Sequence, residues 1–248
     1  MLRRRKVAVN KTVRAPGRPR AFDPKKALDK ALQVFWRHGY EGASLAELTK
    51  AMGINKPSMY AAFGNKHDLF CKVLDRYAET ATAHVKEGLK AATAREAVER
   101  IMLGAADALS DARHPRGCLM VQGALACGEE SKVVQRELCA RRAAGEAAIR
   151  ERLEDAKVAG DLPAGAEPAE LASYVTTVLH GMSVQAAGGA SREKLRGIAA
   201  RAMLAWPIEN REAINAKIRR VIAQLDRGEG ISDDQLDSVL AKLKAQSE

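Results

Sequence analysis

The sequence predicts an all-α protein with a small N-terminal helical domain, a larger helical domain and a short helical tail. Apolar residues recur at the three- and four-residue spacing of helices through most of the 248 residues. No segment alternates apolar and polar residues as a half-buried strand does. Proline and glycine fall mainly between the periodic segments, where they end helices. From these observations we expect about nine helices before the tail.

The first expected helix covers residues 22–38. Asp23 is a suitable N-cap, and Pro24 suits the first helical position because its missing N–H would have no acceptor there. The apolar stripe of this helix consists of Leu28, Ala31, Leu32 and Phe35. The helix therefore has one face to bury against its neighbours.

Two short helices joined by a glycine turn are expected between Ser44 and Gly64. Ser44 caps the first helix, and Gly53 ends it because a helix C-terminus favours a residue that adopts positive φ. Asn55 then caps the second helix, whose first turn tolerates Pro57. A helix, a glycine turn and a second helix with an exposed polar start form the layout of a helix-turn-helix DNA reader. The same corner also occurs in helical proteins that do not bind DNA.

A combined signature runs through the segment from Phe22 to about Tyr77. It consists of Phe35, Gly39, Tyr40, Ser44, Leu48, Gly53, Ile54, Tyr60, Phe63, Lys66, Leu69 and Phe70. Through these residues the segment resembles the TetR-type transcriptional repressors. One departure is Thr49, where the family usually has alanine, and we expect a small adjustment of packing there. The resemblance implies a sequence-specific DNA-binding regulator, a ligand-responsive repressor that binds a palindromic operator as a homodimer.

The resemblance also implies which side chains contact double-stranded DNA. Lys56, Pro57 and Ala61 match the base-facing positions, where Lys56 can donate to guanine and the other two can contact thymine methyl groups. The positions that match phosphate contacts are Ser44, Ser58, Tyr60 and Lys66. Ala61 and Ala62 are small where relatives often carry aromatic or polar side chains. We therefore expect few specific hydrogen bonds per half-site.

Formal charge is concentrated in a basic arm over residues 1–20, which carries eight basic residues and no acidic one. Residues 81–248 are neutral, with 24 residues of each sign. We expect the arm to be flexible and to face phosphates. Residues 16–20 (Pro-Gly-Arg-Pro-Arg) resemble the core of an AT-hook, which would place Arg18 and Arg20 in the minor groove of A·T-rich DNA. The alternative is a solvated tail that adds only non-specific attraction.

A larger helical domain for ligand binding and dimerisation is expected over residues 67–207, after a helix-turn-helix domain over residues 21–66. The expected helices cover residues 66–90, 95–109, 118–128, 131–159, 169–187 and 191–205. The resemblance identifies the last two as the pair that forms a four-helix bundle across a two-fold axis. Small residues such as Gly181 would let these helices approach closely.

The resemblance further implies a pocket for a small-molecule effector of unknown identity. Beyond Tyr77 the aromatic residues are Tyr174 and Trp206, so we do not expect an aromatic cage for a planar cation. Candidate lining residues are Leu103, Met120, Leu125, Val178 and Met182. The same residues would equally suit an ordinary hydrophobic core.

Four cysteines and the lack of a signal peptide or long apolar span indicate a reducing cytoplasm and no membrane partner. Cys118, Cys127 and Cys139 suggest a thiol or soft-metal sensor as an alternative, although small buried cysteines are common and no CxxC pair is present. We expect no metal site and no cofactor. An enzyme is not expected either, because the sequence has no nucleotide-binding glycine loop, serine elbow or zinc-ligand spacing.

A C-terminal helical hairpin is expected over residues 208–248. Apolar periodicity predicts two amphipathic helices joined by a turn at residues 227–230. Residues 225–234 resemble the C-terminal part of ribbon-helix-helix antitoxins, which would imply a toxin-like protein partner. The alternative is a hairpin that packs on the preceding domain or extends the dimer seam.

Overall fold

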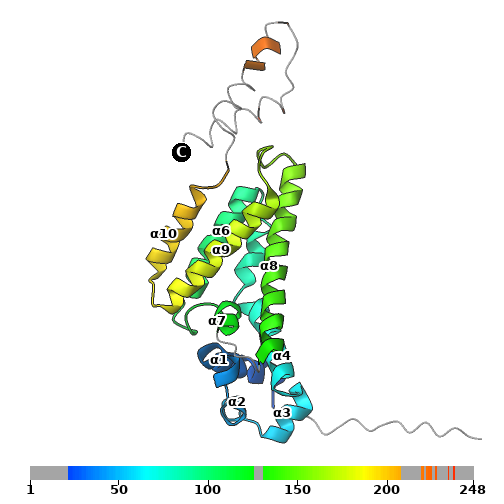
Figure 1. Ribbon diagram of the computed structural model, residues 1–248, viewed down its shortest axis with the longest axis vertical. Helices are drawn as coiled ribbons and strands as arrows, with labels where there is room; N and C mark the ends of the chain where they lie inside the picture. Colours follow the sequence, from blue (N-terminus) through cyan, green and yellow to red (C-terminus); the bar gives the residue numbers. More distant parts are fainter. Residues whose placement is uncertain are drawn as a thin grey trace, which may run out of the picture. The chain divides into compact units, whose positions relative to one another are not determined.

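The computed structural model describes residues 22–125 and 131–207, together with isolated positions between residues 219 and 237. These described residues form ten α-helices, which confirms the predicted all-α class (Figure 1). The chain divides into two compact units between Arg76 and Tyr77. We call them the N-terminal unit and the C-terminal unit.

The N-terminal unit is built from three short helices and the first part of a fourth. They are α1 (Pro24–Gly42), α2 (Leu45–Met52), α3 (Lys56–Phe63) and α4 (Lys66–Thr80). The domain boundary expected at residue 66 stays a prediction; the division into compact units lies within α4. The reason is visible at the start of α4, where Leu69 and Phe70 are completely buried.

Aromatic rings form the core of the N-terminal unit. The Phe70 ring centroid lies 4.9 Å from that of Phe35 and 5.2 Å from that of Tyr40, both in edge-to-face geometry. Asp29 of α1 also accepts hydrogen bonds from Arg76 of α4, at 2.7 Å from Nε. These contacts fix α4 against α1 at the base of the helix-turn-helix.

The C-terminal unit contains the remaining helices. They are α5 (Ala83–Gly88), α6 (Ala94–Leu109), α7 (Leu119–Leu125), α8 (Lys132–Val158), α9 (Pro168–Ala187) and α10 (Arg192–Met203). The expectation of one continuous helix over residues 66–90 was wrong. Thr82 leaves helical geometry at φ −107° and ψ 14°, and its hydroxyl donates to the Ala78 carbonyl at 2.9 Å, so α4 ends and α5 begins after it.

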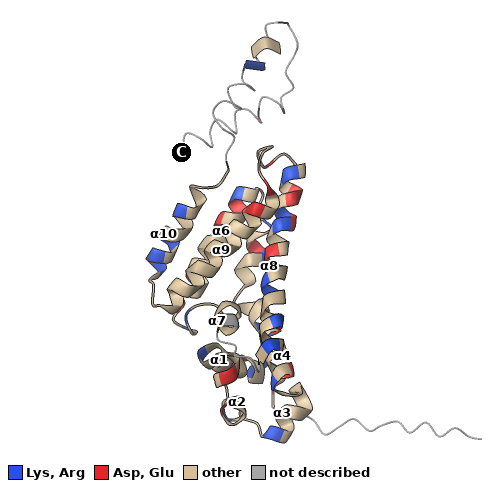
Figure 2. Ribbon diagram, in the orientation of Figure 1, with Lys and Arg blue, Asp and Glu red and all other residues tan. Residues whose placement is uncertain are grey.

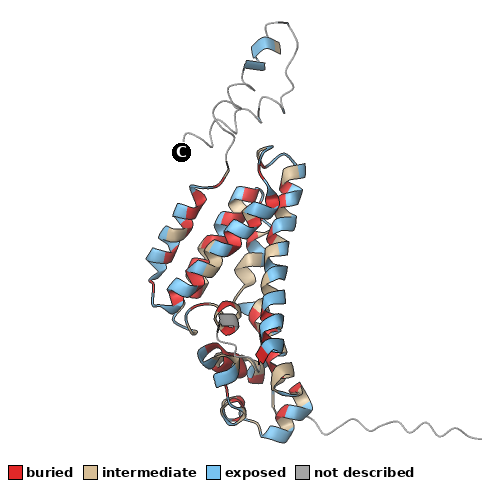
Figure 3. Ribbon diagram, viewed as in Figure 1, coloured by how far each residue is buried: buried red, intermediate tan, exposed pale blue. Residues whose placement is uncertain are grey.

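The core of the C-terminal unit lies among α6, α8, α9 and α10. Helices α8 and α9 run side by side, and α6 packs against both α9 and α10 (Figure 1). Buried and exposed residues alternate along α9 and α10, as expected of helices with one face on the core (Figure 3). Fully buried side chains include Ile101, Leu138, Met182 and Leu195.

Several predictions fall outside the described residues and stay predictions. They concern the basic arm with Arg18 and Arg20, Cys127, and the helical hairpin over residues 208–248, of which isolated positions alone are described. Among the described helices, none is both long enough and apolar enough to cross a membrane.

Candidate nucleic-acid interface

The corner between α2 and α3 is held by local hydrogen bonds. The Ser44 hydroxyl accepts from the Glu47 N–H at 3.1 Å, and the Asn55 side chain accepts from the Ser58 N–H at 2.8 Å. Between the two caps, Gly53 adopts φ +70°, and the Ile54 N–H donates to the Thr49 carbonyl at 3.1 Å. The turn therefore fixes the start of α3 relative to α2.

Thr49, the departure from the family pattern, is accommodated within its own helix. Its side chain is buried in α2, and its hydroxyl donates to the Leu45 carbonyl at 2.8 Å. Because this bond satisfies the hydroxyl, the extra polar group does not disturb the helix crossing.

The recognition helix α3 has one buried and one exposed side. Met59 and Phe63, four residues apart, are 0% and 3% exposed. Lys56, Pro57 and Ala61 are all exposed on the other side. The expected base-facing residues therefore share an accessible surface on a helix anchored by its apolar side.

The residues expected to bind phosphate differ in their surroundings. Tyr60 is 46% exposed, whereas Ser58 is partly buried in the first turn of α3. Ser44 is exposed, and since its oxygen accepts the cap hydrogen bond, its O–H can still donate to a phosphate.

Lys66 opens α4 beside the ring of Tyr40. Its ammonium lies 4.6 Å from the ring centroid, a cation–π distance. Partial burial lowers the pKa of Lys66, and the Glu41 carboxylate opposes that effect. Asn65 and Asp68 cap the helix reciprocally, each side chain accepting from the other's N–H at 2.9 and 3.0 Å. The lysine is thus positioned at a helix N-terminus, where anions are favoured.

Two lysines that we did not single out from the sequence also belong to this unit's polar surface. Lys25 and Lys26 are exposed in the first turn of α1, and both N–H groups donate to Asp23, at 2.9 and 3.4 Å. Basic side chains are electrostatically unfavourable at a helix N-terminus.

Comparison with known proteins gives the family. A family model of bacterial regulatory proteins of the tetR family matches residues 27–73. The chain is also 35% identical over 193 residues to the HTH-type transcriptional repressor ComR of Escherichia coli K12, a match that covers 77% of this chain and 92% of ComR. The chain belongs to the TetR family. This membership confirms the predicted class of regulator and agrees with the expectation that the chain is not an enzyme.

A solved TetR-family structure gives a closer structural parallel. One such structure is a cysteine mutant of the regulator CifR, complexed with 26-bp double-strand operator DNA. Its chain is 43% identical to this one, and the match has a TM-score of 0.74 and covers 77% of this chain and all of CifR. Reduced NemR of E. coli, at 22% identity and a TM-score of 0.59, shares the fold. Nothing in these relatives or in the described residues supports the antitoxin-like interpretation of the tail.

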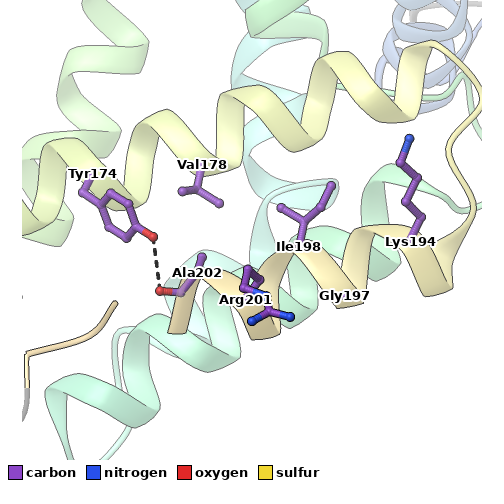
Figure 4. Close-up of a pocket in the computed structure, with 7 residues that line it drawn as sticks. All are labelled: Tyr174, Val178, Lys194, Gly197, Ile198, Arg201 and Ala202. Atoms are coloured by element: carbon purple, nitrogen blue, oxygen red, sulfur yellow. Dashed lines mark hydrogen bonds between the residues drawn. The ribbon is translucent and has the colours of Figure 1, made fainter. Parts of the chain in front are cut away.

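The C-terminal unit of this TetR-family chain has an open groove between α9 and α10. Tyr174, Val178, Ile198 and Ala202 form its apolar floor, with basic side chains at its rim (Figure 4). The Tyr174 hydroxyl donates to the Ala202 carbonyl at 3.2 Å across the groove. Val178, a pocket candidate from the sequence, therefore lies on this surface.

The other pocket candidates lie in different surroundings. Met182 is completely buried in the core, and Leu103 packs against the edge of that core. Met120 is partly buried on α7, where its carbonyl accepts from Arg142 at 2.9 Å. The side chain of Leu125 is outside the described residues.

Cys118 and Cys139 lie in different surroundings. Cys118 is partly buried, its N–H donates to the Ser183 hydroxyl at 2.8 Å, and its thiol is hydrogen-bonded to Tyr77. Burial, and then the Cys118 thiol, raise the pKa of Tyr77. Cys139 is exposed on α8. Within the described ranges no cluster of His, Cys, Asp and Glu could hold a metal ion. Thiol sensing stays a hypothesis.

Proposed function

We propose that this chain represses transcription by binding a palindromic operator as a homodimer, and that a small molecule bound in the C-terminal unit releases it. The observation that carries the proposal is the exposed side of α3, fixed by buried Met59 and Phe63, in a chain 43% identical to the operator-binding regulator CifR along that protein's full length. A helix presented in this way fits the major groove.

The chemistry of each side chain suggests which part of the DNA it contacts. Lys56 supplies a donor for guanine, and Pro57 and Ala61 supply apolar contact to thymine methyl groups. Phosphates are bound by Ser44, Ser58, Tyr60 and Lys66. Each half-site thus offers few direct hydrogen bonds to bases, and further contacts are needed for specificity.

The basic arm is proposed to supply part of that specificity through Arg18 and Arg20 in the minor groove. Support comes from its point of attachment. Phe22, where the described chain begins, packs on Phe63 at the end of α3, with ring centroids 6.1 Å apart. A short extended segment from this point reaches a groove neighbouring the one that α3 enters.

A second copy of the chain is proposed to cover the groove between α9 and α10. Its floor is apolar, and a Cβ atom added at Gly181 or Gly197 would meet nothing within 4 Å, so both helices present open, small-residue surface. Lys194 and Arg201 at the rim keep the edge polar (Figure 4). A dimer is also favoured because one reading unit buries too little surface for useful specificity.

The alternative to an ordinary effector is thiol chemistry at Cys118, supported by its hydrogen bond to Tyr77. A footprinting experiment tests the main proposal. The full chain should protect an inverted repeat upstream of its own or the adjacent gene, and a cognate small molecule should remove that protection. Uniform protection without sequence preference would contradict the proposal and indicate a general DNA-coating protein.

A further inference from the structure

The inward stripe of α8 is interrupted in its middle. Leu138 and Ile149 are buried, at 0% and 3% exposure, but no residue from 139 to 148 is. Helical spacing places Arg142, Gly145 and Glu146 on the stripe between them. Two charged residues and a glycine thus occupy positions where the rest of α8 packs into the core. Gly145 is exposed, and a Cβ atom added there would meet nothing within 4 Å, so there is room beside the helix at this position.

The imidazole of His180, on α9, interacts with the two charged residues of the interruption. Burial lowers the pKa of His180, the Arg142 charge lowers it further, and the Glu146 carboxylate opposes both effects. The imidazole therefore lies within electrostatic reach of both charged groups and is mainly neutral at pH 7.

Thr176 adds a second, independent observation. It lies one helical turn before His180 on α9 and is 7% exposed, and its hydroxyl has no hydrogen-bond partner among the described residues. A buried polar group without a partner is costly, and a binding site is one place where such a cost is retained. A ligand that supplies the missing partner would satisfy the hydroxyl.

Two hydrogen bonds hold Arg142 itself, and one of them connects it to α7. One Nη donates to the Met120 carbonyl at 2.9 Å, and the other donates to the Cys139 sulfur at 3.2 Å. These two bonds use part of the guanidinium's five N–H donors and fix its orientation. A fixed guanidinium suits a carboxylate, which it can bind through two parallel hydrogen bonds.

We propose that Arg142, Glu146, Thr176 and His180, the α8–α9 polar cluster, form the effector site and bind a small carboxylic acid that also carries a hydrogen-bond donor. Arg142 pairs with the carboxylate, Glu146 accepts from the donor group, and the Thr176 hydroxyl and His180 complete the contacts. The carboxylate would pair with the remaining N–H donors of Arg142, and because Arg142 also donates to the Met120 carbonyl, occupancy would be transmitted to α7. The inference rests on the regulatory function proposed above.

Calorimetry on the full-length protein without DNA tests the site. Lactate and 3-hydroxybutyrate represent acids with a hydroxyl donor, and alanine one with an ammonium donor. Propionate lacks the donor, and lactamide lacks the charge. We expect binding by one or both donor-bearing classes, at least about tenfold tighter than propionate or lactamide, because each of those two lacks a hydrogen bond to a charged group.

Two variants and a matched control assign the effect to the cluster. Arg142→Met should weaken binding of the acid at least about tenfold, and Thr176→Val by about threefold to tenfold. Without ligand, T176V should melt at a higher temperature than the wild type, since it removes an unsatisfied hydroxyl at nearly constant shape. Arg150→Met is the control, because Arg150 is exposed on the same helix and pairs with Glu154; its affinity should not change.

The results that overturn the inference are distinct from failure of the proposed function. No heat of binding from any acid, equal binding of lactate and propionate, or equal losses in R142M and R150M would each overturn it. DNA binding is measured separately on the same preparations. If DNA binding persists while the acids do not bind, the effector assignment alone is wrong.

Discussion

At the scale of single residues, two lysines of the N-terminal unit are proposed to contact DNA in different ways. Lys56 stands exposed at the start of α3, where its ammonium can reach a base edge. Lys66 is partly buried over the Tyr40 ring at the start of α4. We therefore expect Lys56 to contact base edges in the major groove and Lys66 to contact only the phosphate backbone.

This difference predicts different mutant behaviour. Lys56→Ala should relax the preference for operator over scrambled DNA. Lys66→Ala should weaken both by the same factor and reduce the slope of log K against log salt by about 1, because one phosphate contact is lost. Fluorescence anisotropy at several salt concentrations measures both quantities. Equal losses on operator and scrambled DNA from both variants would contradict the assignment.

Gly53 carries a second prediction. Its φ of +70° is left-handed, so Gly53→Ala should lower the free energy of unfolding by about 1 kcal/mol. Gly165→Ala is the matched control, since that loop glycine has no positive φ and open space around its Cβ position; it should be neutral or slightly stabilising. Thermal denaturation compares the two. A smaller loss in G53A than in G165A would be inconsistent with the turn described.

At the scale of single residues, the sequence predicted best those roles that depend only on neighbouring residues in the chain. Ser44, Asn55 and Gly53 could be assigned as caps because a cap depends on the next three residues. The approach of His180 to Arg142 could not, since it depends on how α8 and α9 pack. The same holds for Lys66 and Tyr40, which are brought together by the fold.

At the scale of helices, a charged contact connects α6 and α10. Asp107 accepts from Arg196 at 2.9 and 2.7 Å, and Arg192 lies 3.5 Å from the same carboxylate. Basic residues recur along α10, so the aspartate partly balances that helix (Figure 2). The break between α4 and α5 is a further property of this scale. The sequence did not reveal it, because threonine is compatible with a helix, and the bond from the Thr82 hydroxyl to the Ala78 carbonyl is one that helical threonines also make.

The contact between Asp107 and Arg196 predicts that the stability of the protein depends on pH. The hydrogen bond from Arg196, followed by nearby positive charges, lowers the pKa of Asp107 below its ordinary 3.8, although burial opposes this. A lowered folded-state pKa gives stability that is present above the unfolded pKa and is lost as pH falls through the folded value. The wild type should therefore melt above Asp107→Asn by a constant margin at neutral pH, and the margin should shrink below about pH 4.

Melting curves between pH 3 and 7 check this prediction. Because the pair is largely exposed, the margin should be small and should fall with added salt. Glu99→Gln, a change at an exposed carboxylate of the same helix, is the control and should show no such margin. A difference in melting temperature between the wild type and D107N that grows as the pH falls would contradict the lowered pKa of Asp107.

At the scale of the whole molecule, the distribution of formal charge is compatible with the proposed dimer. The net charge of +10 lies in the first third of the sequence, while residues 81–248 are neutral. A neutral helical domain can carry an apolar dimer surface without electrostatic repulsion. The sequence indicated this surface through the small residues of α9, but it could not distinguish Val178 in the groove from Met182 in the core.

The proposed dimer surface gives the fourth prediction. Val178→Lys places a third cation beside Lys194 and Arg201 in the groove, so the variant should sediment as a monomer. Its affinity for the full operator should fall at least about tenfold, because the two N-terminal units are no longer joined and each binds its half-site independently. Val133→Lys, at a site 52% exposed on α8, is the control and should remain dimeric. A dimeric V178K would rule out this groove as the interface.

The central claim is that α3 reads operator DNA as part of a two-fold dimer. Selection of bound duplexes from a random library, with the purified full-length chain, tests it most directly. The account predicts enrichment of an inverted repeat whose half-sites lie about one helical turn or somewhat more apart, with weaker enrichment in K56A. Recovery of no preferred sequence, or of a single site without two-fold symmetry, would contradict it.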